Sequence, residues 1–429
     1  MNLKENIFEI IQLSKSKIAK DSAIVLTGNI IGAGLGFIAT ILITRTLGPA
    51  QFGLFSVAIA VMGITSQISD FGINSGLVRF ASLYLKNDNQ KANLMFKVSL
   101  KFKLISSILV FLIGFFASES LAIHVFGKTE LILPLKLSFI GVFGLSFVGY
   151  ISTTLQARQS FVKFALVNLI DPLGKLTLIG LLFLTYKLNL LSALTTVVIL
   201  PFIAFLIGSL IIPKDFLMAK GDENAALNEL FHFSKWIFVS VFCVTIFTQL
   251  DVLMLSYFKI MEEVGYYSAG YRLGFSFSII LGSFITILLP IISKLTEKQQ
   301  IINYRKKTLK ITLFIAIIFF PIFFLAKPLI LAIYGVPYLD SVIIFQILFL
   351  KFLLVLIFNP INIVIYSINK PMIASYGNLL QLSFNFIGNY LVIPMYGAYG
   401  AAIVSLITDV IGVSFMLYYL HIHFKNWKM

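Results

Sequence analysis

The sequence predicts an all-α polytopic membrane protein, with twelve transmembrane helices in two six-helix lobes around a central cavity. Its composition is the first indication, because 59% hydrophobic residues, 12% charged residues and a mean hydropathy of +0.97 do not fit a water-soluble globule. The second indication is a series of apolar runs, which match the roughly 20 residues that a helix needs to cross a bilayer core. A weak internal repeat, at a shift of about 210 residues, is the third.

The apolar runs are separated by charged residues or by glycine and proline. We expect spans over residues 21–44, 51–78, 99–118, 131–155, 164–186, 190–212, 231–256, 264–290, 309–326, 338–366, 371–393 and 398–422.

Lysine and arginine divide the predicted loops into two alternating sets. One set includes both ends of the chain and the segments around 79–103, 158–163, 214–235 and 294–310, and it holds 24 of these residues. The other set holds five, which are Arg45, Lys128, Lys187, Lys259 and Lys327. Because basic loops stay on the cytoplasmic side, both termini are expected there. The net charge of +15 therefore reflects membrane topology and anionic lipids, and we expect no nucleic-acid partner.

Four pairs of segments match in the same order along the two halves of the chain. For example, "FGLFSVA" at 52–58 faces "VGYYSAG" at 264–270, and Gly127 aligns with Gly335. Six spans separate the repeats, so both halves cross the membrane in the same sense. We expect an N-terminal lobe over 1–212, a cytoplasmic linker over 213–230 and a C-terminal lobe over 231–429.

Several charged residues fall inside the predicted helices. Lys136, Lys175, Arg272 and Lys351 are the basic ones. A charge at the bilayer centre costs about 2.5–3.5 kcal/mol, so such a residue is expected to face a cavity or a partner. Since Arg and Lys bind phosphate strongly where water is scarce, these four residues are candidate contacts for a phosphate-bearing substrate.

Three of the carboxylates within predicted spans are Asp70, Asp251 and Asp409. A buried carboxylate is the usual site at which a transporter couples to an ion gradient, so these are candidate ion-coupling residues. A hydrogen bond between helices explains each of them equally well.

Structural roles compete with the functional ones for the basic residues too. Lys175 follows Asp171 by four residues, so an ion pair on one helix face is an equal alternative. Lys136 is close enough to the outer end of its helix to extend its ammonium group to the surface. Asp251 and Arg272 have similar depths on consecutive helices and form a candidate pair.

Catalytic and metal chemistry find little support in this sequence. A single cysteine, Cys243, allows no internal disulfide, and the four histidines are scattered or close to the C-terminus. The predicted outward loops are too short for an outer catalytic domain. We expect a transporter with no cofactor and no metal.

Two motifs in the first half carry a family resemblance. "RTLGPAQFGLF" at 45–55, followed by "DFGINSGLVR" at 70–79, resembles the opening signature of the bacterial polysaccharide flippase (Wzx) family, which shares a superfamily with MATE exporters and the lipid II flippase MurJ. "QLDVLMLSYF" at 249–258, "VGYYSAGYRLG" at 264–274 and "IPMYGAYGAA" at 393–402 resemble the pattern of the second half. The positions that match the family's motifs are Arg45, Gly48, Gly53, Asp70, Gly72, Arg79, Asp251, Gly265 and Arg272.

The resemblance implies two six-helix bundles around a V-shaped cavity and transport by alternating access. It implies a cargo of undecaprenyl-diphosphate-linked oligosaccharide, carried across the bacterial inner membrane with membrane lipids and other polysaccharide assembly proteins as partners. Arg45 joins the candidate substrate contacts on this basis. Three alternatives stay open: a MATE-like exporter of small cations, a lipid II flippase, and a membrane glycan polymerase or ligase.

Overall fold

The computed structural model describes residues 17–292, 298–367 and 371–425, and all the regular structure in these ranges is helical. The α-helices are α2 (Lys17–Asp70), α3 (Ile73–Asn87), α4 (Asn89–Ser120), α5 (Ile132–Ala157), α6 (Phe161–Leu184), α7 (Leu190–Ile211), α8 (Glu223–Phe258), α9 (Met261–Ile292), α10 (Lys298–Phe319), α11 (Ala326–Ile333), α12 (Ser341–Ser367) and α13 (Pro371–Lys425). Short π or 3-10 turns cover Leu121–Val125, Thr129–Leu131, Asp215–Met218, Phe320–Phe323 and Val336–Tyr338.

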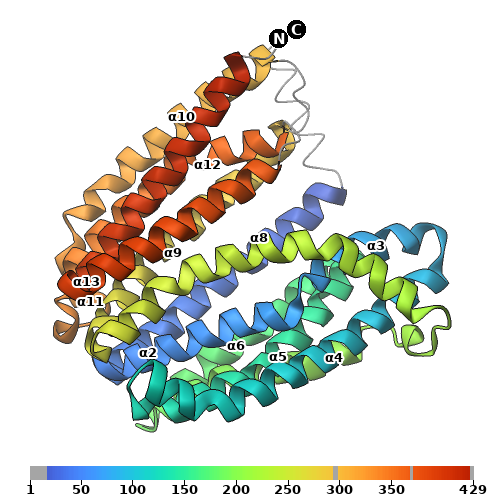
Figure 1. Cartoon of the computed structure of the whole chain (residues 1–429), viewed down its shortest axis with the longest axis horizontal. Helices are drawn as coiled ribbons and strands as arrows, with labels where there is room; N and C mark the ends of the chain where they lie inside the picture. The colour runs from blue at the N-terminus through green and yellow to red at the C-terminus, as the bar shows by residue number, and fades with distance from the viewer. Residues whose placement is uncertain (1–16, 293–297, 368–370, 426–429) are drawn as a thin grey trace.

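The helices form two groups that meet at one end of the molecule and diverge towards the other (Figure 1). Helices α2 to α7 make the N-terminal lobe, and α8 to α13 make the C-terminal lobe. Helix α8 packs against α2, α3 and α4 of the first lobe and against α13 and α9 of the second. We call the end where the lobes meet the closed end and the opposite end the open end.

Two very long helices are each bent at a glycine at the closed end. Helix α2 has 54 residues and breaks at Gly48 (φ +67°), and α13 has 55 residues and breaks at Gly397 (φ +56°). A straight helix of that length would be about 80 Å long, whereas the bilayer core is about 30 Å thick. Glycine adopts positive φ without strain, so each bend returns the chain across the membrane. The pairs of spans expected at 21–44 with 51–78 and at 371–393 with 398–422 meet at these bends.

Among the differences from the expected boundaries, two concern the end of the second span and the expected linker. The second span ends at Asp70 instead of residue 78, because Phe71 (φ +48°) and Gly72 (φ +75°) interrupt the helix and α3 begins at Ile73. The expected linker 213–230 contains a 3-10 turn and the first residues of α8, which begins at Glu223 with the side chain of Asp222 as its N-cap.

Eight helices in the described ranges are long and apolar enough to cross a membrane, and one bent helix pair adds a ninth. Both α2 and α13 count once among the eight although each contains a bend. The total of twelve spans stays a prediction.

The internal repeat is visible in the order of the elements. In the first lobe α4 is followed by a short π-helical segment, by Gly127 at φ +63°, by a 3-10 turn and by α5. In the second lobe α10 is followed by the short helix α11, by Gly335 at φ +93°, by a 3-10 turn and by α12. The two glycines aligned in the sequence therefore perform the same turn after a broken helix.

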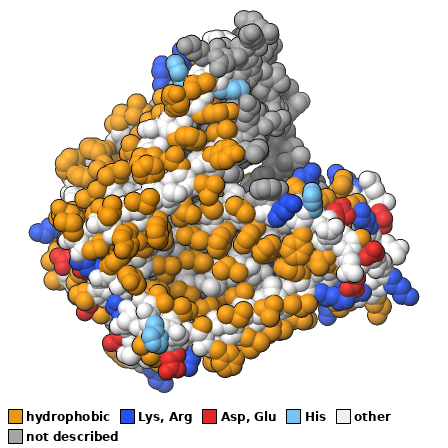
Figure 2. Space-filling view, viewed as in Figure 1, with side chains coloured by type: hydrophobic (Ala, Val, Ile, Leu, Met, Phe, Trp, Pro, Cys, Tyr) orange, Lys and Arg blue, Asp and Glu red, His pale blue; other side chains and the backbone are white. Residues whose placement is uncertain are grey.

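The outer surface has the distribution of side chains that a bilayer requires. Hydrophobic side chains cover the broad middle of the visible face, and charged side chains gather towards its ends (Figure 2). Large apolar residues such as Phe116, Leu184 and Leu210 are more than 70% exposed on their helices. Such a surface is stable in lipid and unfavourable in water.

The first turns of α8 are docked on the N-terminal lobe at the open end. Glu223 accepts hydrogen bonds from Lys101 and is 3.1 Å from the ammonium of Lys97, and these lysines, Lys101 first, lower the pKa of the Glu223 carboxyl. The ring of Phe71 stacks on Phe238 at 4.4 Å between centroids. Helix α8 is therefore held by both lobes.

Candidate functional site

At the closed end, the backbones of the two lobes are in direct contact. A Cβ atom on Gly53 of α2 would overlap with the carbonyl oxygen of Met261, and one on Gly265 of α9 would overlap with that of Pro49. Gly53 and Gly265 occupy equivalent positions in the two repeats. The absence of side chains at these positions lets α2 and α9 approach closely and exclude water between them.

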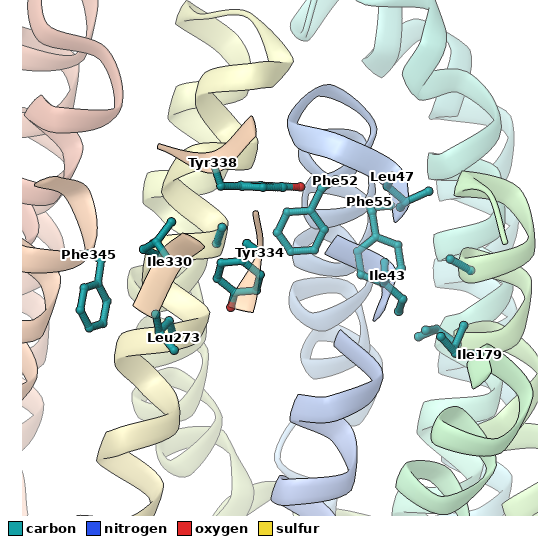
Figure 3. Close-up of a cluster of buried hydrophobic side chains, with 14 of the residues drawn as sticks. Ile43, Leu47, Phe52, Phe55, Ile179, Leu273, Ile330, Tyr334, Tyr338 and Phe345 are labelled. Carbon is teal, nitrogen blue, oxygen red and sulfur yellow. The ribbon is translucent and has the colours of Figure 1, made fainter. Parts of the chain in front are cut away.

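Aromatic side chains close the same end from within. Phe52 of α2 lies beside Tyr334 and Tyr338 of the C-terminal lobe, and Phe55 stacks on Phe52 on the side away from these tyrosines (Figure 3). The rings of Phe52 and Tyr338 are 6.3 Å apart, edge to face, and the Tyr338 hydroxyl donates a hydrogen bond of 2.9 Å to the carbonyl of Thr44. We call these four residues the aromatic plug.

Two basic residues of the N-terminal lobe latch this end by binding helix C-termini of the other lobe. Arg45 Nε donates to the carbonyl of Ile333 at 2.7 Å, and its Nη2 donates to Ala332, both in the last turn of α11. Lys128 Nζ donates to the carbonyl of Ser256 at 2.6 Å, near the end of α8. Cations are favourable at helix C-termini, where the last carbonyls lack partners. Arg45, a candidate substrate contact, thus has structural partners in this conformation.

Arg272 of α9 lies beside the aromatic plug. Its guanidinium carbon is 5.6 Å from the ring of Phe52 and 6.0 Å from that of Phe55, so it faces the N-terminal lobe. Among the described residues it has no hydrogen bond or ion pair, and it does not pair with Asp251 as the sequence led us to expect. The hydroxyl of the neighbouring Tyr334 is buried without a hydrogen-bond partner.

Asp251 of α8 is instead the centre of a buried network inside the C-terminal lobe. It is 3% exposed. Its Oδ1 accepts from Asn385 at 3.1 Å and Asn389 at 2.6 Å, and its Oδ2 accepts from Tyr267 and, at 2.6 Å, from Ser405. Four donors from α9 and α13 therefore stabilise this carboxylate.

Lys351 of α12 joins Asp251 to a second carboxylate. Its ammonium donates to Ser405 Oγ at 2.9 Å and is 3.7 Å from Asp409, which also accepts from Gln381 at 2.9 Å. Because Lys351 is 7% exposed and surrounded by its own lobe, it is closed to a ligand in this conformation. Lys351 thus belongs to the same network as Asp251 and Asp409 in this conformation, and its role as a substrate contact stays a prediction.

The N-terminal lobe has its own buried ion pair, between Asp70 and Lys103. Lys103 Nζ is 2.6 Å from Asp70 Oδ1 and the residue is only 1% exposed. The pair lies where α2 ends, beside the hydroxyls of Ser69 and Ser106. The sequence places Lys103 at the end of a basic segment, whereas its side chain lies inside the lobe.

The remaining candidates lie within the N-terminal lobe. Lys175 is 3.2 Å from Asp171, so the structural ion pair foreseen from their spacing is present. Lys136 is half-buried, with its ammonium 5.5 Å from the ring of Phe115. Neither side chain contacts the aromatic plug.

Sequence reasoning missed the polar uncharged members of the Asp251 network. Asn385 and Asn389 are four residues apart and share one face of α13 with Gln381, which stands one turn before Asn385. Two amides at helical spacing in a membrane span are a signal that the sequence carried. Lys103 gave no such signal, because it stands close to the many lysines of the preceding loop.

Two lobes related by an internal repeat, a lipid-facing apolar surface and buried ion pairs define a multi-pass membrane transporter. The chain belongs to the polysaccharide biosynthesis protein family, whose model matches residues 18–296.

Two relatives match along most of their length. A protein of Haloferax volcanii, named a probable low-salt glycan biosynthesis flippase, is 22% identical over 408 residues, which cover 94% of this chain and 83% of the relative. The lipid III flippase of Escherichia coli is 24% identical over 310 residues, which cover 69% of this chain and 72% of the relative.

Solved structures share the fold. An inward-facing multidrug resistance MATE family transporter of the MOP superfamily matches with a TM-score of 0.77 at 13% identity, covering 92% of this chain and 94% of that one. An outward-facing structure from the same family gives 0.58, also at 13% identity, with 96% of each chain covered. The lipid II flippase MurJ in an inward closed conformation gives 0.74 at 17% identity, covering 92% and 87%.

Proposed function

We propose that this protein flips undecaprenyl-diphosphate-linked oligosaccharide units, of the O-antigen or capsule type, across the bacterial inner membrane by alternating access. The family match and the flippase relatives support the class of substrate. The observation that carries the proposal in this chain is Arg272, a cation that faces the other lobe beside the aromatic plug and has no hydrogen bond or ion pair among the described residues.

A diphosphate is the chemical group that Arg272 fits. A guanidinium group forms two parallel hydrogen bonds with a phosphate. These hydrogen bonds are stronger where water is excluded. The unpartnered hydroxyl of Tyr334 beside it adds a further donor. In this arrangement the headgroup binds between the lobes while the prenyl tail stays in the surrounding lipid.

The conformation is assigned as inward-facing. From the distribution of the basic loops we infer that the closed end faces outward and that the open end and both termini face the cytoplasm. The higher TM-score with an inward-facing MATE transporter than with an outward-facing one supports the same state. The substrate therefore enters from the inner leaflet, where lipid-linked units are assembled.

Ion coupling is assigned to the buried carboxylates. Asp251, Asp409 and Lys351 are joined through Ser405 across three helices of the C-terminal lobe, so a change of charge on one carboxylate alters contacts of α8, α12 and α13 together. The Asp70–Lys103 pair occupies the end of α2 in the other lobe. Protonation or cation binding at these sites would bias the balance between the two states.

Complementation of a flippase-deficient strain tests the substrate assignment. Arg272→Ala is expected to abolish surface polysaccharide while the protein remains in the membrane at its normal level, and Arg272→Lys is expected to retain a fraction of export because it keeps the charge. Lys187→Ala removes the same charge from an exposed outer loop and serves as the control. Normal export by Arg272→Ala would refute the role of this residue.

A small-molecule exporter is the alternative that shares this fold. Drug resistance on overexpression, with an intact surface glycan on deletion, would favour that function. Accumulation of lipid II on the cytoplasmic side when the protein is depleted would point instead to a lipid II flippase. An association with other polysaccharide assembly proteins is part of the proposal and is tested by copurification.

A further inference from the structure

A cavity lies at the open end of the molecule, away from the aromatic plug. It has a volume of about 700 Å³ and opens between α3 and the first turns of α8. Arg79 and Phe80 of α3 line it on one side, and Asn228, Glu229, His232, Phe233 and Ile237 are among its lining residues on α8. None of these residues belongs to the networks described above.

Three side chains of this cavity have polar groups without a partner. Among the described residues, the side chains of Arg79, Asn228 and His232 make no hydrogen bond or ion pair. Asn228 and His232 are exposed and stand four residues apart, so they occupy one face of α8. Arg79 projects from α3 with its guanidinium 4.3 Å from the ring of Phe233. Stacking on a ring uses the face of a guanidinium and leaves its N–H edge free.

The charge of the cavity favours an anion. Glu229 is its one acidic lining residue, and that carboxylate is already engaged, 3.1 Å from the ammonium of Lys91 and hydrogen-bonded by the hydroxyl of Tyr84. The charge of Glu229 is therefore compensated, and the positive charge of Arg79 remains available. Phosphate, with several acceptor oxygens, matches an arginine edge and neighbouring amide and imidazole donors.

The depth of the cavity identifies the kind of phosphate compound. Ile237 lines the cavity and lies in the part of α8 that is apolar enough to cross a membrane. The preceding turns of α8 carry Asn228, Glu229 and His232. The cavity therefore lies at the boundary between water and lipid, the depth at which lipid phosphates are found, and its apolar wall of Phe80, Phe233 and Ile237 suits an amphiphile.

We propose that this cavity binds the phosphate of a lipid headgroup, with Arg79 as the principal contact and Asn228 and His232 as further donors. Two sources share this chemistry. One is an isoprenyl diphosphate. In that case the cavity is a loading site for the substrate, and this assignment rests on the proposed function. The other is an anionic phospholipid that holds α3 and α8 together at the membrane surface.

Binding to the purified full chain tests the proposal with two probes. The first is geranylgeranyl diphosphate, titrated in detergent. The second is phosphatidylglycerol, whose retention is measured by native mass spectrometry after reconstitution in phosphatidylcholine discs containing it. Arg79→Ala is expected to weaken binding of at least one probe about tenfold, because a charge-assisted bidentate contact is lost. His232→Ala is expected to weaken binding of the same probe by a smaller factor.

Lys86→Ala is the matched control, because Lys86 is an exposed cation on α3 that does not line the cavity. A loss confined to geranylgeranyl diphosphate identifies a loading site, and a loss confined to phosphatidylglycerol identifies a phospholipid site. Unchanged binding of both probes by Arg79→Ala, with wild-type thermal stability, overturns the proposal. Arg79→Lys keeps the positive charge but cannot form the bidentate contact. It takes the place of Arg79→Ala in the test if the alanine variant does not fold.

The outcome is separable from that of the proposed function. If Arg79→Ala binds both probes normally while Arg272→Ala still blocks export, the cavity proposal fails and the flippase stands. If Arg79 controls retention of phosphatidylglycerol but deletion of the gene leaves the surface glycan intact, the cavity proposal stands and the flippase fails.

Discussion

Lys351 compensates two carboxylates at once. It contacts Asp409 directly and reaches Asp251 through the hydroxyl of Ser405, and all four side chains are buried in the C-terminal lobe. Asp251 has four hydrogen-bond donors of its own, whereas Asp409 depends on Lys351 and Gln381. Compensation of the charges of these two carboxylates therefore depends on the ammonium group of Lys351.

We expect Lys351→Met to destabilise the protein by about 3–5 kcal/mol, because breaking a buried pair leaves an uncompensated charge. The double variant Lys351→Met with Asp409→Asn removes both charges and is expected to regain most of that stability. Thermal unfolding in detergent measures both effects. Lys136→Met, which removes a half-buried lysine without an ion pair among the described residues, is expected to have a small effect.

Export by the double variant then separates structure from coupling. If the network carries ion coupling, the double variant is stable but does not support surface polysaccharide. Full export by this variant would show that the pair serves stability alone, and equal instability of the single and double variants would contradict the charge argument.

The charged members of these sites were predictable from the sequence, because a full charge in an apolar run is rare and costly. Their partners were not. The contacts of Asp251 with Asn385 and Asn389 join residues more than 130 positions apart, and no local spacing predicts them. Arg45 was assigned to the substrate by resemblance, yet its hydrogen bonds lead to α11, a helix in the other half of the chain.

At the scale of elements, the latch formed by Arg45 and Lys128 joins helix ends of opposite lobes. Each side chain occupies the C-terminal carbonyls of a helix in the C-terminal lobe, α11 for Arg45 and α8 for Lys128. Opening the closed end must break these contacts together with the close packing of α2 on α9 at Gly53 and Gly265.

Arg45→Ala combined with Lys128→Ala is expected to shift the population towards the outward-open state, since two charge-assisted contacts hold only the closed form. Spin labels on Lys187→Cys and Lys327→Cys, in a Cys243→Ser background, report the distance across this end by electron paramagnetic resonance. We expect a new, longer distance in the double variant. Glu119→Ala, an exposed site outside the latch, is the control, and an unchanged distance distribution in the latch variant would exclude the latch.

The elements themselves were largely predictable, because apolar length and glycine positions determine where helices run and bend. The turns at Gly48 and between 393 and 398 were expected at the right positions. The early end of the second span was not, because Phe71 adopts positive φ, a conformation that its sequence does not indicate. Its ring stacks on Phe238 of α8, and this distant contact compensates the local strain.

At the scale of the molecule, the two lobes are similar in element order but unequal in chemistry. The C-terminal lobe holds the larger ion network and Arg272, whereas the N-terminal lobe supplies the latch side chains and half of the aromatic plug. Alternating access through such a molecule requires the lobes to separate at the closed end while each lobe keeps its own packing.

This requirement predicts that a link between the lobes blocks transport and a link within one lobe does not. Phe52→Cys with Tyr338→Cys joins the lobes across the aromatic plug, where the ring centroids are 6.3 Å apart. Phe277→Cys with Phe319→Cys joins α9 to α10 within one lobe at the same centroid separation of 6.3 Å. Both pairs are made in the Cys243→Ser background and linked with a short bismaleimide.

We expect the link across the plug to reduce transport of a lipid-linked substrate in vesicles to background, and the link within the lobe to leave most of it. Each unlinked cysteine pair measures the cost of the substitutions alone. Because the two links have the same span and chemistry, a difference between them reports relative motion of the lobes. Equal transport by both linked proteins would mean that substrate crosses without separation of α2 from the C-terminal lobe, which is incompatible with alternating access at this gate.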